Sequence, residues 1–104
     1  MRLVFDMGCI TFGKDFHPEF DGYLWEKDGG VWISSIFVKH GQEGRGHFRN
    51  LIKELKKKYV WIKIPTPSVK MAAIAFHYGF TLKSEYDDEA GEDVQLMYWK
   101  KASV

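Results

Sequence analysis

The sequence contains a single cysteine, Cys9, among its 104 residues, so no internal disulfide bond can form. One thiol also cannot supply a metal cage of several thiolates, and no metal is expected. No apolar run approaches the ~18 residues that a membrane-spanning helix needs, and no membrane association is expected. The apolar start of the chain is broken at Asp6, which argues against a secretory signal peptide. The expected compartment is therefore the reducing cytoplasm.

A strong net charge is also absent, because the formal charge is only +1. This balance argues against a strongly basic nucleic-acid-binding protein. The charges are nevertheless unevenly distributed. Residues 39–70 hold nine Lys or Arg and two acids, whereas residues 85–93 hold six acids and no base. A basic middle suits a phosphate-bearing ligand, and the alternative is a solvated helix face.

What the chain does contain is typical of a globular protein. Apolar residues make up 45% and aromatic residues 16% of the sequence, which is too much for a disordered chain. No repeat, low-complexity tract or linker divides it, so residues 1–104 are expected to form a single domain.

Alternating and β-branched segments predict seven short strands. They cover residues 1–6, 8–12, 23–27, 31–38, 60–64, 81–86 and 94–100. Residues 13–21 are predicted to be a loop, Asp28-Gly29-Gly30 a hairpin turn, and residues 87–93 an acidic turn.

Two segments show helical spacing instead. The first has one apolar stripe, formed by Phe48, Leu51, Ile52, Leu55 and Tyr59. The second is predicted to begin at a Ser68 cap and to end at Gly79. Its predicted stripe consists of Val69, Ala72, Ala73, Phe76 and Phe80.

This order predicts an α+β (mixed α/β) domain. The sheet is expected to be mostly antiparallel and twisted, with two main helices. One right-handed β-α-β crossover should join the strands at 31–38 and 60–64.

A glycine-rich segment leads from the strand at 31–38 into the first helix. Free N–H groups and the helix dipole at such a helix N-terminus favour phosphate. Gly44 and Gly46 would let a diphosphate approach the backbone, and Arg45 and Arg49 could add charged contacts. The segment is neither a Walker A motif nor a dinucleotide-binding G-x-G-x-x-G. An ordinary glycine-rich connection remains the alternative.

Residues 38–52 (VKHGQEGRGHFRNLI) resemble the acetyl-CoA motif of the Gcn5-related N-acetyltransferase (GNAT) family. Residues 72–80 (AAIAFHYGF) are similar to that family's helix ending in Gly-Phe. The likeness covers roughly two thirds of the chain. The family's usual N-terminal helices are missing, as in shortened phage acetyltransferases that include an anti-CRISPR acetyltransferase.

The resemblance implies acetyl-CoA as the acyl donor, with its pantetheine arm held between two splayed strands at 31–38 and 60–64. The implied acceptor is a primary amine on a macromolecule, with a protein lysine favoured. The residues expected to bind acetyl-CoA are Phe37, Val38, Gln42, Glu43, Gly44, Arg45, Gly46, His47 and Arg49.

The sequence departs from the family at the catalytic positions. Ala75 stands where the family often has a tyrosine acid, and Ser34 and Ser35 stand where it often has a carboxylate. Tyr78 is the predicted substitute acid because it should point away from the core stripe, and His77 is second. A catalytically degenerate cofactor- or partner-binding module, and a nucleic-acid-binding domain using the basic middle, remain alternatives.

Overall fold

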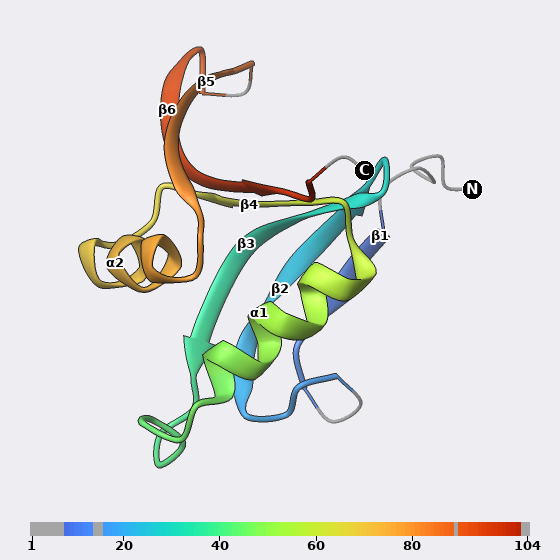
Figure 1. The fold of residues 1–104 in the computed structure, drawn as a ribbon, viewed down its shortest axis with the longest axis vertical. Helices are drawn as coiled ribbons and strands as arrows, with labels where there is room; N and C mark the ends of the chain where they lie inside the picture. The colour runs from blue at the N-terminus through green and yellow to red at the C-terminus, as the bar shows by residue number, and fades with distance from the viewer. Residues whose placement is uncertain (1–7, 14–15, 89, 103–104) are drawn as a thin grey trace.

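Six strands form one sheet in the order β1-β2-β3-β4-β6-β5, and two helices pack on it (Figure 1). The computed structural model describes residues 8–13, 16–88 and 90–102. In chain order the elements are β1 (Gly8–Thr11), β2 (Phe20–Lys27), β3 (Gly30–Val38), α1 (His47–Lys58), β4 (Trp61–Pro65), α2 (Val69–His77), β5 (Thr81–Asp87) and β6 (Glu92–Lys100). The predicted mixed fold, with its mostly antiparallel sheet and two helices, is confirmed.

The first three strands form an antiparallel meander. The β2–β3 hairpin turns over Asp28 and Gly29, with φ angles of 49° and 80°. Two successive positive φ angles are typical of a type I′ turn, which matches the twist of paired strands. The predicted turn is therefore correct, although β2 begins within the segment predicted to be a loop. The strand predicted at 1–6 lies outside the described residues.

The crossover through α1 places β4 parallel to β3, as predicted. The two strands pair over three positions only, from Gly30↔Trp61 to Trp32↔Lys63. Beyond that point β3 bends away from β4 (Figure 1). Ser34 forms a β-bulge near the start of this stretch. Its neighbours Ile33 and Ser35 pair with consecutive residues of β2, so Ser34 itself is the extra residue.

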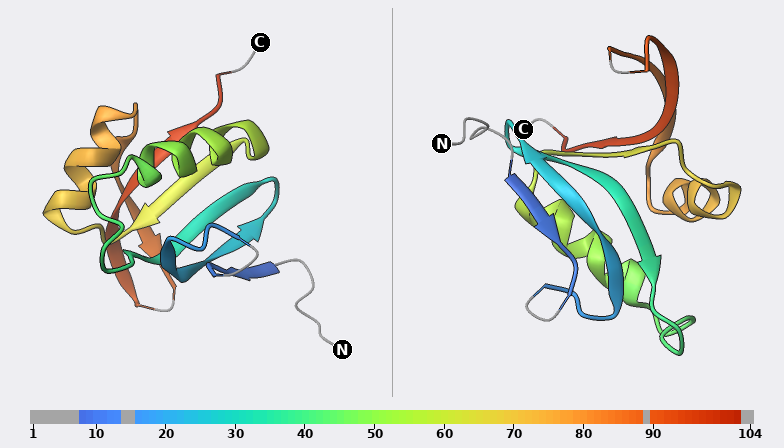
Figure 2. Two further views of the ribbon diagram at one scale, coloured as in Figure 1. Left: turned by 90° about the horizontal axis from the view of Figure 1, so that it is seen from below. Right: turned by 180° about the vertical axis from the view of Figure 1, so that it is seen from behind.

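Both helices pack on the same face of the sheet (Figure 2). The predicted stripe of α1 is correct, since Leu51, Ile52 and Leu55 are each at most 1% exposed. Tyr59, just after α1, is also buried, and its hydroxyl donates a hydrogen bond to the Glu26 carboxylate of β2. Burial and this carboxylate raise the pKa of Tyr59.

The ends of α2 agree with the prediction. The Ser68 hydroxyl accepts a hydrogen bond from the N–H of Met71, as an N-cap should. At the other end the N–H of Phe80 bonds to the carbonyl of Ala75, with Gly79 at φ 91°. This is a Schellman motif, and it ends the helix.

The predicted buried stripe of α2 is correct at Ala72 and Phe80 but wrong at its other three positions, Val69, Ala73 and Phe76. Val69 and Phe76 are 89% and 70% exposed, whereas Ala75 is fully buried. The residues of α2 and its C-cap that pack on the core are Met71, Ala72, Ala75 and Tyr78. Almost every position from 69 to 76 is apolar, so the sequence offers two overlapping stripes. The contacts with α1 and the sheet decide between them.

The described residues contain no helix both long and apolar enough to cross a membrane.

The difference between the two helices gives a stability prediction. Leu55→Ala removes a buried side chain and should lower the free energy of unfolding by about 2–5 kcal/mol. Phe76→Ala removes a larger but exposed side chain and should change it by less than ~0.5 kcal/mol. Urea denaturation of both variants checks this. A comparable loss in Phe76→Ala would contradict the face assigned to α2.

Candidate functional site

Among the described residues, no strand pairs with the second half of β3 on the side where it diverges from β4. Residues 33–38 extend past the last pair, Trp32↔Lys63, while β4 continues along β6 as far as Pro65. Phe37 and Val38 lie at the end of this stretch, 66% and 36% exposed. The two parallel strands therefore form a splayed pair, as the family resemblance implied.

A glycine-rich segment joins the open end of this splay to α1. Gly41, Gly44 and Gly46 all have positive φ, at 87°, 73° and 78°. Gly46 is the N-cap residue of α1, and no side chain caps that end. The first turn of α1 also contains no acid. Its N–H groups and the positive end of the helix dipole are thus available to an anion.

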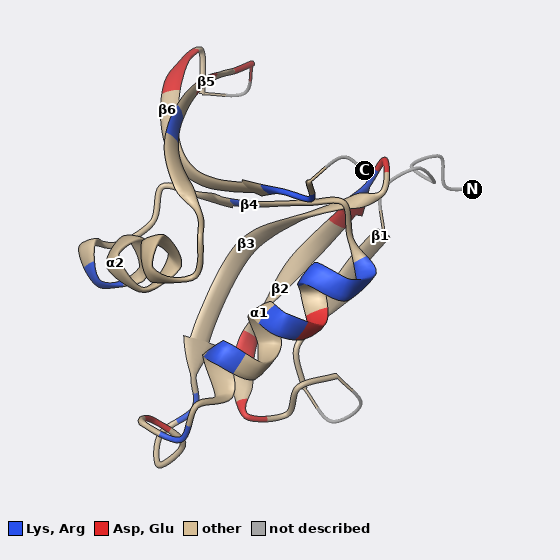
Figure 3. Ribbon diagram, viewed as in Figure 1, with Lys and Arg blue, Asp and Glu red and all other residues tan. Residues whose placement is uncertain are grey.

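The chemistry of this helix end suits a phosphate-bearing ligand. Arg45 and Arg49 are exposed beside it, and a Cβ placed on Gly46 would lie 3.1 Å from an Arg49 guanidinium nitrogen. The Arg49 side chain therefore lies next to Gly46. Lys and Arg continue along α1, while acids occupy the far tip of the β5–β6 hairpin (Figure 3). The glycines and the two arginines fit a diphosphate group.

Other predicted residues of this segment contact one another. The His47 ring nitrogen Nε2 lies 3.0 Å from the Gln42 amide oxygen, and its ring packs edge-on against Phe20. The Glu43 carboxylate accepts a hydrogen bond from the N–H of Gly41. These contacts hold the segment in a turn. Because Gln42 and His47 contact each other, the backbone of the segment is more available to a ligand than these two side chains are.

The predicted catalytic pair lies at the C-terminal end of α2. The Tyr78 and His77 rings pack edge-to-face, with centroids 5.0 Å apart. His77 is exposed, whereas Tyr78 is half-buried and packs on the core, so the expectation that Tyr78 points away from the core was wrong. Its carbonyl accepts a hydrogen bond of 2.6 Å from the Lys56 ammonium of α1, whose pKa is lowered by burial.

The sheet face opposite the helices carries a second group of side chains. Trp32, Trp61 and Tyr98 alternate with core residues on β3, β4 and β6, so they point to this face. The Trp61 ring lies over Gly30, where a Cβ would come within 1.9 Å of it. Only glycine allows this close approach.

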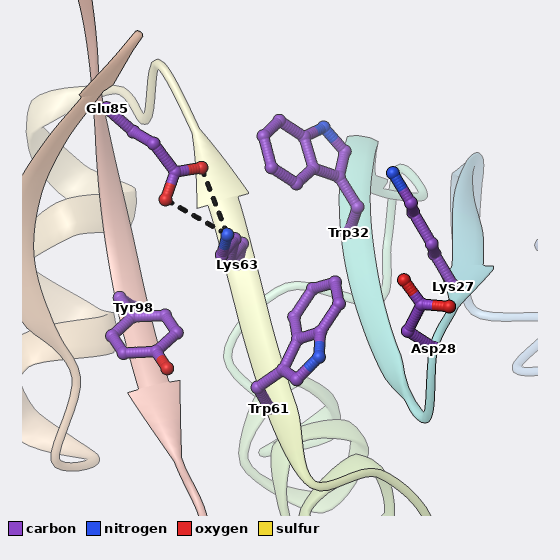
Figure 4. Close-up of a pocket in the computed structure, with 7 residues that line it drawn as sticks. All are labelled: Lys27, Asp28, Trp32, Trp61, Lys63, Glu85 and Tyr98. Atoms are coloured by element: carbon purple, nitrogen blue, oxygen red, sulfur yellow. Dashed lines mark hydrogen bonds and ion pairs between the residues drawn. The ribbon is translucent and has the colours of Figure 1, made fainter. Parts of the chain in front are cut away.

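These aromatic rings line a cavity of about 330 Å³ at the base of the splay (Figure 4). The residues lining the cavity are Lys27, Asp28, Trp32, Trp61, Lys63, Glu85 and Tyr98. The Lys63 ammonium lies 3.0 Å from both oxygens of the Glu85 carboxylate. Lys63 lies between Ile62 and Ile64 in the sequence. This alternation of apolar and polar residues is the one sequence signal that Lys63 lies on the face opposite the core. Its partner on β5 could not be read from the sequence.

The ion pair alters the titration of the carboxylate. The hydrogen bonds from Lys63 lower the pKa of Glu85, against a smaller opposing effect of burial, and Lys83 at 3.6 Å contributes in the same direction as Lys63. Glu85 is therefore ionised, and its carboxylate lies between the ammonium groups of Lys63 and Lys83.

A comparison with solved structures finds a protein with the same fold. A crystal structure from Agrobacterium tumefaciens, described as a "putative acetyltransferase", superposes with a TM-score of 0.63 at 16% sequence identity. The match covers 91% of this chain and 76% of that one. No known family profile matches the sequence, and no curated protein matches it. The chain thus shares its fold with that acetyltransferase structure.

The Lys63–Glu85 pair gives a pH prediction. Because the pKa of Glu85 is lowered on folding, the pair stabilises the protein fully above the unfolded value near 4.5, and this stability is lost as the pH falls through the folded value. Lys63→Met removes the partner, so unfolding stability should fall less steeply than in the wild type between about pH 6 and about pH 3. Urea midpoints across this range test it. Parallel curves for the two proteins would refute it.

Proposed function

We propose that the chain is an acetyl-CoA-dependent N-acetyltransferase of the GNAT type, acting on a primary amine of a macromolecule, with a protein lysine favoured as acceptor. The observation that carries the proposal is the splay of β3 from β4, with a glycine-rich segment leading from its open end into the uncapped N-terminus of α1. The shared fold with an acetyltransferase structure supports it.

In this proposal the donor lies along the exposed end of β3. The N–H groups at Gly44, Gly46 and the first turn of α1 hold the diphosphate, with charge-assisted contacts from Arg45 and Arg49. Phe37 and Val38 flank the pantetheine arm in the splay. Backbone N–H groups near the bulge at Ser34, which has no partner in β2, polarise the thioester carbonyl.

The acceptor approaches from the helix-free face of the sheet. No described helix covers this side, which suits a macromolecule better than a small metabolite that needs an enclosed pocket. The amine must lose a proton before it attacks the thioester carbon, and the CoA thiolate then leaves. Tyr78 is the proposed acid for this leaving group, with His77 as its neighbour.

A second candidate is a catalytically degenerate module that binds the cofactor or a partner without turnover. Ala75 favours it, because the position where the family often carries a tyrosine acid is fully buried and holds a methyl group. Acetyl-CoA binding without transfer to any lysine of a peptide library would identify this second function.

The donor site is tested by a glycine substitution. Gly46→Glu places a carboxylate where the diphosphate should bind, and CoA affinity should fall by at least ~2 kcal/mol, which is about 30-fold. Gly91→Glu is the matched control, since Gly91 has a similar φ of 70° and an open environment in the β5–β6 turn. Calorimetry measures both. Equal affinities in two folded variants would remove the site from this segment.

The acid is tested by removing one hydroxyl. Tyr78→Phe should lower the transfer rate at least ~10-fold while leaving acetyl-CoA affinity intact, because general acid catalysis usually contributes about 10² or more. Tyr86→Phe is the control, since Tyr86 is 62% exposed on β5 and pairs with Asp93 near the β5–β6 turn. Initial rates with a confirmed acceptor decide the matter. An unchanged rate in Tyr78→Phe would deny it the acid role.

A further inference from the structure

Large apolar side chains are exposed on α2 and on the neighbouring strand β5. Among the described residues, four of the eight large apolar side chains that are exposed belong to these two elements. They are Val69 and Phe76 of α2, and Leu82 and Tyr86 of β5, and each is at least 60% exposed. We call these four residues the α2–β5 patch. Exposed apolar side chains that gather in this way mark an interaction surface.

The members of the α2–β5 patch lie on the side of the sheet that carries the helices. Leu82 pairs with Met97, which belongs to the buried core, and paired residues of adjacent strands share a face. Tyr86 is four residues further along β5 and therefore lies on the same face. Val69 and Phe76 are two helical turns apart, so they share one side of α2. The patch is thus formed by one side of a helix and one face of a strand.

A groove of about 600 Å³ lies between α2 and the β5–β6 hairpin. Its apolar lining includes Val69, Ala72 and Leu82, and its charged lining consists of Glu92 and Asp93. Neither of these two acids forms an ion pair within the part of the chain that the structure describes. The groove therefore offers both apolar contacts and two carboxylates that a cation can approach.

A cation lies on the other flank of the same patch. Lys70 is the one Lys or Arg of α2, it is exposed, and it has no ion pair with any described residue. Successive residues of a helix are about 100° apart around its axis, so Lys70 and Ala72 project from opposite flanks of the stripe that contains Val69. In Figure 3 the basic position of α2 faces away from the acidic hairpin. The patch thus has opposite charges on its two flanks.

We propose that the α2–β5 patch is the interface of a symmetric homodimer, in which α2 and the β5–β6 hairpin pack against the same elements of a second copy of this chain. A two-fold axis that runs alongside α2 exchanges the two flanks and preserves the level along the helix. Lys70 of one protomer then faces the carboxylates of Glu92 and Asp93 of the other. The symmetry produces the reciprocal contact, as an isologous interface requires.

A second copy satisfies this surface better than a partner of one charge sign. A basic segment would pair with the carboxylates of the groove but would meet the like charge of Lys70, and an acidic segment would have the opposite difficulty. In the dimer the apolar stripe between the flanks is removed from water, which drives association, and the ion pairs fix the orientation. The interface lies on the helix-bearing face, so the opposite face stays open. The inference goes beyond the proposed function and does not depend on it.

Sedimentation equilibrium of the full-length protein tests the dimer. The mass should rise from one chain to two as the concentration increases through the micromolar range. Phe76→Glu should raise the dissociation constant at least ~30-fold, because an unpaired carboxylate would have to be buried in the apolar stripe. Since Phe76 is exposed in the single chain, this variant should fold. Tyr23→Glu, which changes a 41% exposed aromatic residue of β2, is the control and should dimerise normally.

A charge exchange tests the orientation of the two chains. Lys70→Glu and Asp93→Lys should each raise the dissociation constant about 10-fold, because each places like charges opposite one another. The double variant, which carries both changes in one chain, should dimerise at least ~3-fold more tightly than either single variant. These two residues lie on opposite flanks of the patch, so a recovery requires contact between chains.

Three results would overturn the proposal. A single-chain mass at every concentration up to ~1 mM would exclude the dimer and leave the groove to a different protein. A dimer that survives in Phe76→Glu and dissociates in Tyr23→Glu would place the interface on another surface. A double variant that dimerises no more tightly than the single variants would refute the pairing of Lys70 with the acidic flank.

Discussion

The parallel contact between β3 and β4 is the constraint on which the rest of the molecule depends. It joins the meander of β1, β2 and β3 to the second half of the sheet through three residue pairs. Because these pairs stop at Trp32 and Lys63, the two strands separate while both remain anchored, β3 to β2 and β4 to β6. A longer contact would close the splay, and a shorter one would weaken the connection between the two halves.

The two faces of the sheet differ in what covers them. On one face α1 and α2 cover the core, and the beginning of α1 presents its N–H groups at the mouth of the splay. On the other face no described helix lies over Trp32, Trp61 and Tyr98. In the proposed function, a thioester held between the strands would be reached from this second face, so donor and acceptor would meet through the sheet rather than on one surface.

Local signals account for what the sequence predicted correctly. The Asp28-Gly29 dipeptide is sufficient to specify the hairpin turn. Ser68 caps α2 by accepting a hydrogen bond from the N–H three positions later. The apolar stripe of α1 stands out because polar residues occupy the other side of the helix. The face of α2 could not be predicted in this way, because its small apolar residues fit two orientations. The Lys63–Glu85 pair could not be predicted from the sequence for a different reason. β6 lies between β4 and β5 in the sheet, and only the complete strand order brings the two side chains together.

The same strand order has a consequence for how the chain folds. The β1–β2, β2–β3 and β5–β6 pairs join strands that are neighbours in sequence, and closing short loops costs little chain entropy. The β3–β4 pair joins strands that α1 separates in sequence, so a longer loop must close before it forms. Contacts between distant segments slow folding. The splay would therefore be among the last features to assemble, after the hairpins on either side of it already exist.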